Sequence, residues 1–297
     1  MAYRKIVTGV FPYGSQHWVG DGFPVRNVFP SSGVVDQVNP FLMLDYAGPT
    51  EFAPSDKPRG VGQHPHRGFE TVSISYQGAV AHRDSSGNSG TIGPGDVQWM
   101  TAASGLVHEE MHAPDFTRKG GTFEGVQLWV NLPKAHKMSA PKYQALASDQ
   151  IPTVNLGDGA SARVIAGELG GVSGPAKTFT PIGVFDVRLT AGSRAELTLP
   201  ENHNTAVVLL RGELLINSSE SVKGEAQLAV LSPTGNSVLL EGIRESLVLV
   251  LTGEPIDEPV VSYGPFVMNT QDEIRQALND YRAGKMGHLE EVSLGAR

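Results

Sequence analysis

The stretch QHPHRGFETVSISY, at residues 63–76, decides the interpretation of this chain. Its second half alternates in polarity and is rich in β-branched residues, which is typical of a strand. In extended backbone, residues i and i+2 point to the same side, with Cα atoms roughly 6.5 to 7 Å apart. The imidazoles of His64 and His66 could therefore converge on one ion at about 2.1 Å, so His-x-His is a ligand spacing for a strand.

A second histidine segment, GLVHEEMH, occupies residues 105–112. On a helix, His108 and His112 would lie one turn apart with Glu109 as a base, which matches the His-Glu-x-x-His motif of zinc proteases. On a strand, His108 and Glu110 would instead share a face and add a third imidazole and a carboxylate to the first pair.

The sequence favours the strand for this second segment. Ser104-Gly105 precedes it and Pro114 follows closely, which leaves little room for a helix. The protease interpretation also leaves His64 and His66 unexplained. Five of the nine histidines lie between residues 64 and 112, so we expect one site in that region.

Short apolar or alternating runs bounded by turn residues recur along the whole chain. The sequence holds 35 Gly and 20 Pro in 297 residues, an excess over the usual roughly 12% that suits many turns. This pattern predicts an all-β sandwich or barrel. The clearest predicted strands are at residues 71–76, 127–130, 184–189, 206–210, 227–231 and 246–251.

One helix is well signalled near the C-terminus. Thr270 and Glu273 form a capping box, and Gly284 ends the helix. One face is kept apolar by Ile274, Leu278 and Tyr281. We expect this helix to dock on a sheet.

Charge and composition exclude several classes of protein. The net charge of −8 disfavours direct binding to nucleic acid, because such affinity comes largely from basic side chains. The absence of cysteine excludes disulfides and thiolate metal sites. No apolar run approaches the roughly 20 residues that span a bilayer, and no signal segment is recognisable. We therefore expect a soluble cytoplasmic protein.

Residues 134–148 are expected to be a linker, with solvated lysines at 134, 137 and 142.

Several longer motifs carry a resemblance to a known family. Residues 64–71, 82–85, 93–102 and 127–133 closely resemble the pirin family of the cupin superfamily, and weaker likeness extends over most of the chain. The resemblance implies two cupin-type β-barrels, or jelly rolls, in tandem with a short C-terminal helix. We expect an N-terminal metal-binding domain at residues 1–137 and a C-terminal domain at residues 138–297 that lacks metal ligands.

Carried over residue by residue, the family's metal ligands fall on His64, His66, His108 and Glu110. Glu109 departs from the small polar residue that is common in the family, but on a strand it would face away from the ion. The resemblance implies Fe(II) as the metal. A donor set of imidazole and carboxylate would also accept Mn, Co, Ni, Cu or Zn.

The resemblance further implies an enzyme, a quercetin 2,3-dioxygenase that uses O2 to cleave flavonols. Glu110 would be the catalytic residue that takes the proton of the flavonol 3-hydroxyl. The alternative is an iron-dependent regulatory protein that acts on a protein partner as a transcription coregulator or enzyme modulator, without catalysis. In both cases we expect a monomer with no direct contact to nucleic acid or membrane.

Other polar residues near the motifs have simpler interpretations. We expect His82 to hydrogen-bond Asp84 or a turn, His112 to be a loop residue near the site, and Glu70 to be structural. Arg67 would either pair with a carboxylate or steer substrate, and the sequence does not separate these. Three aromatic residues are expected in the core: Phe41, Phe69 and Trp99.

Overall fold

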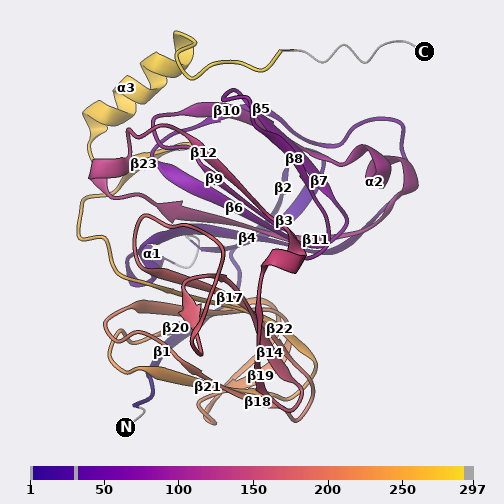
Figure 1. The fold of residues 1–297 in the computed structure, drawn as a ribbon, viewed down its shortest axis with the longest axis vertical. Coiled ribbons are helices and arrows are strands. Elements are labelled where there is room, and N and C mark those ends of the chain that lie inside the picture. The colour runs from indigo at the N-terminus through magenta and orange to yellow at the C-terminus, as the bar shows by residue number, and fades with distance from the viewer. Residues whose placement is uncertain (1–2, 30–32, 291–297) are drawn as a thin grey trace.

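The computed structural model describes residues 3–29 and 33–290, which form two β domains stacked on each other (Figure 1). Helices are few and short among these residues. They are α1 (Val35–Val38), α2 (Pro114–Lys119) and α3 (Gln271–Arg282), with 3₁₀ turns η1 (Lys134–His136) and η2 (Ser148–Gln150).

The N-terminal domain consists of two facing antiparallel sheets. The larger sheet has the order β12 (Lys142–Leu146), β9 (Val97–Thr101), β6 (Phe69–Gln77), β11 (Gly121–Asn131), β4 (Phe41–Phe52), β3 (Phe23–Phe29) and β2 (Gln16–Val19). The smaller sheet has the order β5 (Gly60–His66), β10 (Leu106–His112), β7 (Val80–Asp84) and β8 (Ser89–Ile92).

The C-terminal domain is built on one large antiparallel sheet that curls around an apolar core. Its main order is β1 (Val7–Phe11), β20 (Glu220–Leu231), β19 (Asn204–Ile216), β22 (Ser246–Gly253), β17 (Ile182–Leu189), β14 (Ala160–Ala166) and β13 (Thr153–Gly157). β21 (Ser237–Gly242) pairs with β19 and with β18 (Arg194–Thr198). Two short hairpins complete the fold: β15 (Glu168–Leu169) with β16 (Val172–Ser173), and β23 (Val261–Tyr263) with β24 (Phe266–Met268).

The predicted all-β class and the predicted elements are confirmed. Each of the six runs named above lies inside a strand. The predicted C-terminal helix is α3, where the Thr270 side chain accepts a hydrogen bond from the Glu273 backbone N–H. Gly284 follows the helix with a φ of 72°, a conformation that costs glycine little.

The prediction of a linker at residues 134–148 is wrong in part. Residues 142–146 form β12, which extends the larger N-terminal sheet by pairing with β9. Lys137 is not solvated, because its Nζ donates to Gly68 O, Asn131 Oδ1 and Val267 O. Three acceptors satisfy the three protons of an ammonium group, which makes burial of this side chain tolerable.

Strands from both sides of residue 137 share sheets. β1 joins the C-terminal sheet beside β20, while β12 belongs to the N-terminal sheet. In Figure 1 the start of the chain accordingly lies with the C-terminal domain, and α3 lies over the N-terminal one. The division at residue 137 stays a prediction.

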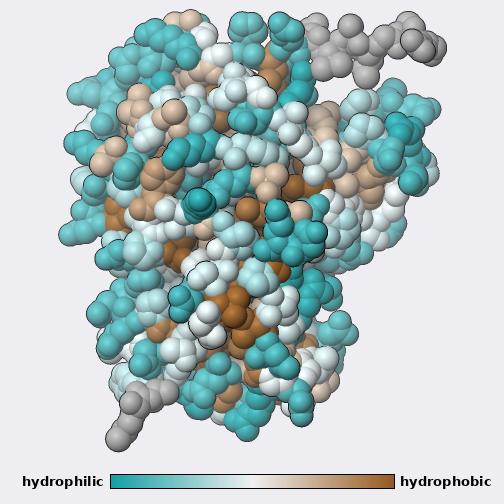
Figure 2. Space-filling view, viewed as in Figure 1, coloured by the Kyte–Doolittle hydropathy of each residue, from teal (hydrophilic) through white to brown (hydrophobic). Residues whose placement is uncertain are grey.

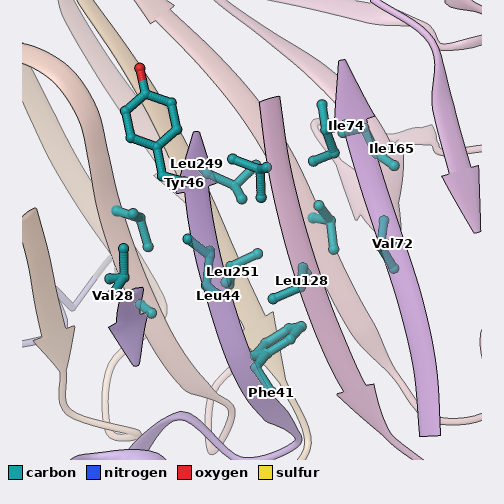
Figure 3. Close-up of a cluster of buried hydrophobic side chains, with 14 of the residues drawn as sticks. Val28, Phe41, Leu44, Tyr46, Val72, Ile74, Leu128, Ile165, Leu249 and Leu251 are labelled. Atoms are coloured by element: carbon teal, nitrogen blue, oxygen red, sulfur yellow. The ribbon is translucent and has the colours of Figure 1, made fainter. Parts of the chain in front are cut away.

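The two domains meet through the outer faces of their large sheets. Leu44 and Leu128 of the N-terminal sheet and Leu249 and Leu251 of the C-terminal sheet belong to one buried apolar cluster (Figure 3). Burial of apolar area contributes roughly 25 cal/mol per Å², so this face holds the domains in fixed relation. The opposite face of the N-terminal sheet is therefore free to line an interior.

The C-terminal segment returns to the N-terminal domain after leaving its own sheet. Ser85 Oγ donates to Met286 O, and Gln63 Nε2 donates to Leu289 O. This segment thus covers the outside of the smaller sheet, which carries both histidine motifs.

The exterior shown in Figure 2 is mostly hydrophilic, with apolar residues in small separate patches. Among the helices of the described residues, none has the length and apolar character needed to cross a membrane.

Candidate metal centre and its cavity

Two neighbouring strands carry the predicted ligands. His64 and His66 lie on β5, and His108 and Glu110 lie on β10, which pairs antiparallel to β5 with His108 opposite His64. The segment 105–112 is therefore a strand and not the helix of a zinc protease. The register shifts between His108 and Glu110, which is typical of the irregularities that re-aim side chains near functional sites.

The strands bring the three imidazoles together. Ring centroids are 4.3 Å apart for His64 and His108, 4.8 Å for His66 and His108, and 4.9 Å for His64 and His66. One potential ligand atom from each of these residues lies within 4.8 Å of the others. Potential ligand atoms of Glu110, His108 and His82 form a second group, in which all lie within 4.8 Å of one another.

The protonation and pairing of these imidazoles suit metal binding. Burial, with the neighbouring histidines, holds the pKa of His66 and His108 well below the ordinary histidine value, so both rings are neutral near pH 7. Among the described residues, the buried His108 Nε2 has no hydrogen-bond partner. His64 Nδ1 lies 2.8 Å from Gly62 O, which leaves its Nε2 for a ligand. Three imidazoles lie together, and within the part of the chain that the structure describes His66 and His108 each have a buried nitrogen atom without a hydrogen-bond partner, which fits a divalent metal ion.

The Glu110 carboxylate is held by two donors on the facing sheet. Ser73 Oγ donates to Glu110 Oε1 at 3.1 Å, and Gln127 Nε2 donates to Glu110 Oε2 at 3.2 Å. Ser73 Oγ also lies 2.6 Å from Gln127 Oε1, so its single hydroxyl proton alternates between Gln127 and Glu110. These bonds fix the carboxylate across the interior between the two sheets.

A chain of three side chains leads away from His108. His108 Nδ1 lies 3.4 Å from His82 Nδ1, and His82 Nε2 lies 3.4 Å from Asp84 Oδ2. The predicted contact of His82 with Asp84 is thus present, although long for a hydrogen bond. Asp84 accepts further bonds from the Ser86 and Asn88 backbone N–H groups. With Nε2 of His108 used for a metal, its Nδ1–H would donate to His82, which sets the tautomer of both rings.

The other acidic and histidine residues lie outside the cluster. Glu109 faces outward and pairs with Arg83, as the strand interpretation predicts. His112 is on β10 and not in a loop, which corrects the prediction; its Nε2 lies 2.9 Å from Gly22 O amid aromatic rings. Glu70 accepts a bond from Thr101 and belongs to no ligand group of the described residues.

Of the two roles predicted for Arg67, the structure shows the pairing with a carboxylate. Its Nη1 donates to Asp280 Oδ2 on α3 at 2.9 Å, and its Nε donates to Ser104 O. Arg67 therefore pairs with a carboxylate outside the cavity. Of the aromatic residues, Phe41 and Trp99 lie in the interdomain core, while the buried Phe69 packs against Trp129 at an interplanar angle of 32° and contacts His66.

A cavity of about 520 Å³ opens over the cluster inside the N-terminal domain. His64, His66 and Glu110 line one part of it. Apolar side chains line much of the rest, among them Phe23, Val80, Ile92, Phe123 and Trp129. This size lies within the range of roughly 300 to 1,000 Å³ that is usual for small-molecule sites.

The sequence patterns did not identify most of the cavity lining, including Met43, Asp45, Ser73 and Gln127. Ser73 and Gln127 lie in predicted strands, so alternation alone would have put them on a common face with Thr71 and Trp129. The interior of the C-terminal domain differs, since its core is formed by apolar side chains such as Leu197, Leu209 and Val250.

Two stacked β domains, one apolar inside and one with a histidine cluster over a cavity, define a two-domain cupin with a candidate metal centre. Comparison with known proteins narrows this class. Residues 22–130 match the sequence profile of Pirin, and residues 184–287 match that of the Pirin C-terminal cupin domain. The chain belongs to the pirin family.

Relatives and solved structures agree with this assignment. A provisionally named quercetin 2,3-dioxygenase of Pseudomonas aeruginosa is 52% identical over 282 residues, covering 95% of this chain and 98% of that protein. Pirin of Mus musculus is 39% identical over 254 residues, covering 84% and 83%. A crystal structure of quercetin 2,3-dioxygenase from Acinetobacter baumannii is 48% identical, with a TM-score of 0.94 over 97% of this chain and all of that one.

Proposed function

We propose that this protein is a metal-dependent dioxygenase that cleaves flavonols such as quercetin. The observation that carries the proposal is the cavity of about 520 Å³ that brings an apolar interior directly against the histidine cluster and Glu110. The names of its similar proteins support the same activity.

In this proposal His64, His66, His108 and Glu110 hold one metal ion, which we expect to be Fe(II). Three imidazoles and a carboxylate leave coordination positions open on a five- or six-coordinate ion. A bound redox-active divalent ion supplies Lewis acidity toward a substrate hydroxyl and the electron-transfer chemistry that reaction with O2 requires.

Side chains of the protein transfer the proton, orient Glu110 and exclude water. Glu110 accepts the proton of the flavonol 3-hydroxyl, which makes the heterocycle electron-rich and open to attack by O2, with ring cleavage and loss of CO. Ser73 and Gln127 orient the carboxylate for this transfer through their hydrogen bonds. Phe23, Val80, Phe123 and neighbouring side chains exclude water and pack against the aromatic faces.

The direct test is oxygen uptake by the iron-loaded protein with quercetin. We expect flavonol-dependent consumption of O2 and release of CO. Quercetin that binds under argon but is not turned over when O2 is admitted, with iron fully loaded, would contradict the proposal.

A second candidate is an iron-dependent regulatory protein that acts on a protein partner. One contact favours it: Arg67, next to His66, bonds Asp280 on the surface helix α3, so a change at the cluster has a physical route to the exterior. The oxygen-uptake experiment separates the two, because a regulator alone would consume no O2 with a flavonol.

A further inference from the structure

A row of polar side chains crosses the cavity side of the larger N-terminal sheet. Across β3, β4, β11, β6 and β9, Asn27 pairs with Asp45, Asp45 with Gln127, Gln127 with Ser73, and Ser73 with Gln98. Residues directly opposite each other on paired strands share a face of the sheet. The five side chains thus form one strip, of which Asp45, Gln127 and Ser73 line the cavity.

The strip has a metal end and a far end. At the metal end, Ser73 and Gln127 hold Glu110. Of the three strip residues that line the cavity, Asp45 is the farthest from the metal end, one strand beyond Gln127 and two beyond Ser73. Because neighbouring strands are about 4.8 Å apart, the Asp45 backbone lies roughly 5 Å past Gln127 and roughly 10 Å past Ser73. This span matches hydroxyl groups on different rings of one small aromatic molecule.

Asp45 is a buried carboxylate with unused hydrogen-bonding capacity. It is 7% exposed, and among the described residues Asn27 is its one hydrogen-bond donor, with Asn27 Nδ2 to Asp45 Oδ1 at 2.7 Å. Burial raises the pKa of Asp45 above the ordinary aspartate value. Asp45 lines the cavity and its Oδ2 accepts no hydrogen bond from the described residues, so a ligand hydroxyl placed here has an acceptor.

The rest of the cavity limits what such a ligand could be. Val19, Phe23, Val25, Val80 and Ile92 offer no hydrogen-bonding side chains. A ligand therefore needs apolar faces together with hydroxyl groups along one edge. A planar polyhydroxylated aromatic compound has both.

We propose that Asp45 is a specificity-determining residue that accepts a hydrogen bond from a hydroxyl group remote from the reacting one. The inference rests on the proposed function, because it places the reacting hydroxyl at Glu110. It predicts that the site prefers polyhydroxylated flavonols over those that carry the 3-hydroxyl alone, since a site built to bond a hydroxyl discriminates against analogues that lack it.

The test is a binding cycle under argon with the iron-loaded protein. Quercetin and 3-hydroxyflavone, which has only the 3-hydroxyl group, are titrated against the wild type, Asp45→Asn and Asp115→Asn. The last is the same substitution at an exposed site of the same domain. We expect Asp45→Asn to weaken quercetin binding about tenfold and 3-hydroxyflavone less than twofold, with Asp115→Asn unchanged for both.

The possible outcomes distinguish failure of the role of Asp45 from failure of the proposed function. Equal changes for the two ligands in Asp45→Asn would overturn the role of Asp45 and leave the proposed function intact. If the wild type bound neither compound, both would fail. Wild-type protein that binds quercetin no more tightly than 3-hydroxyflavone would also contradict the inference, and this comparison does not depend on how the variant folds.

Discussion

At the scale of the residue, the contacts around His108 distinguish a ligand from the groups that orient it. His82 lies between His108 and Asp84 and stacks on Tyr143, with ring centroids 5.2 Å apart. A ring nitrogen of His82 also lies within 4.8 Å of potential ligand atoms of His108 and Glu110. The structure thus allows two roles for His82, and the proposal gives it the orienting one.

Replacement of His82 by phenylalanine separates these roles. The variant His82→Phe keeps a ring against Tyr143 but removes the acceptor for His108 Nδ1–H. We expect the metal affinity to fall about 10- to 100-fold, as is usual when the partner of a metal-bound histidine is lost. Competition with a chromophoric chelator measures this change. Complete loss of metal would instead identify His82 as a ligand, and unchanged affinity would show that it does not orient His108.

At the scale of the element, alternation along β6 explains why its polar residues have unrelated roles. Ser73 points into the cavity, whereas Val72 points into the interdomain core. Glu70 shares the parity of Val72 and lies away from the cavity, where burial raises its pKa to about 7 against an ordinary 4.5. We therefore expect Glu70 to affect stability and not metal binding.

The substitution Glu70→Gln tests this assignment through pH. A raised pKa in the folded state means that the stability contributed by protonated Glu70 is complete below about pH 4.5 and is lost as the pH rises through about 7. Glutamine does not titrate. The stability of Glu70→Gln relative to the wild type should therefore rise by roughly 2 to 4 kcal/mol between pH 4 and pH 8.

Chemical denaturation of both proteins at the two pH values gives this difference, and other titrating groups cancel in the comparison. A difference that does not vary with pH would show that Glu70 is not a buried carboxyl group of raised pKa. Loss of bound metal in Glu70→Gln would contradict its structural role.

The strands and the helix α3 could be predicted from the sequence more easily than the contacts between strands. Periodicity and turn residues identified the strands and α3 because those signals are local. The strand interpretation of residues 105–112 also followed locally, from Gly105 and Pro114. β12 was missed because Lys142 to Leu146 is stabilised by pairing with β9, which is a long-range contact.

At the scale of the whole molecule, the two domains use one architecture differently. The inner face of the N-terminal sheet carries the polar strip from Asn27 to Gln98, and its interior remains hollow, whereas the C-terminal interior is packed with apolar side chains. The histidine spacing pointed to the first domain from sequence alone. The cavity, the role of Asp45 and the orientation of Glu110 depend on strands far apart in the chain, so no local pattern reveals them.

The contacts of the C-terminal segment also could not be predicted from local sequence patterns. The capping box predicted α3, but its docking on the metal-bearing domain through Asp280 and Arg67 joins residues more than 200 positions apart. Lys137 was misinterpreted for a related reason, because its acceptors Gly68 and Val267 come from two distant segments.

The metal content of His66→Ala shows whether the histidine cluster binds the metal ion. Protein purified without chelator is analysed for bound metal, with His136→Ala as the matched control, since His136 is exposed and lies outside the cluster. We expect about one ion per chain in the wild type and in His136→Ala, and almost none in His66→Ala. Unchanged metal content in His66→Ala would contradict the proposed site.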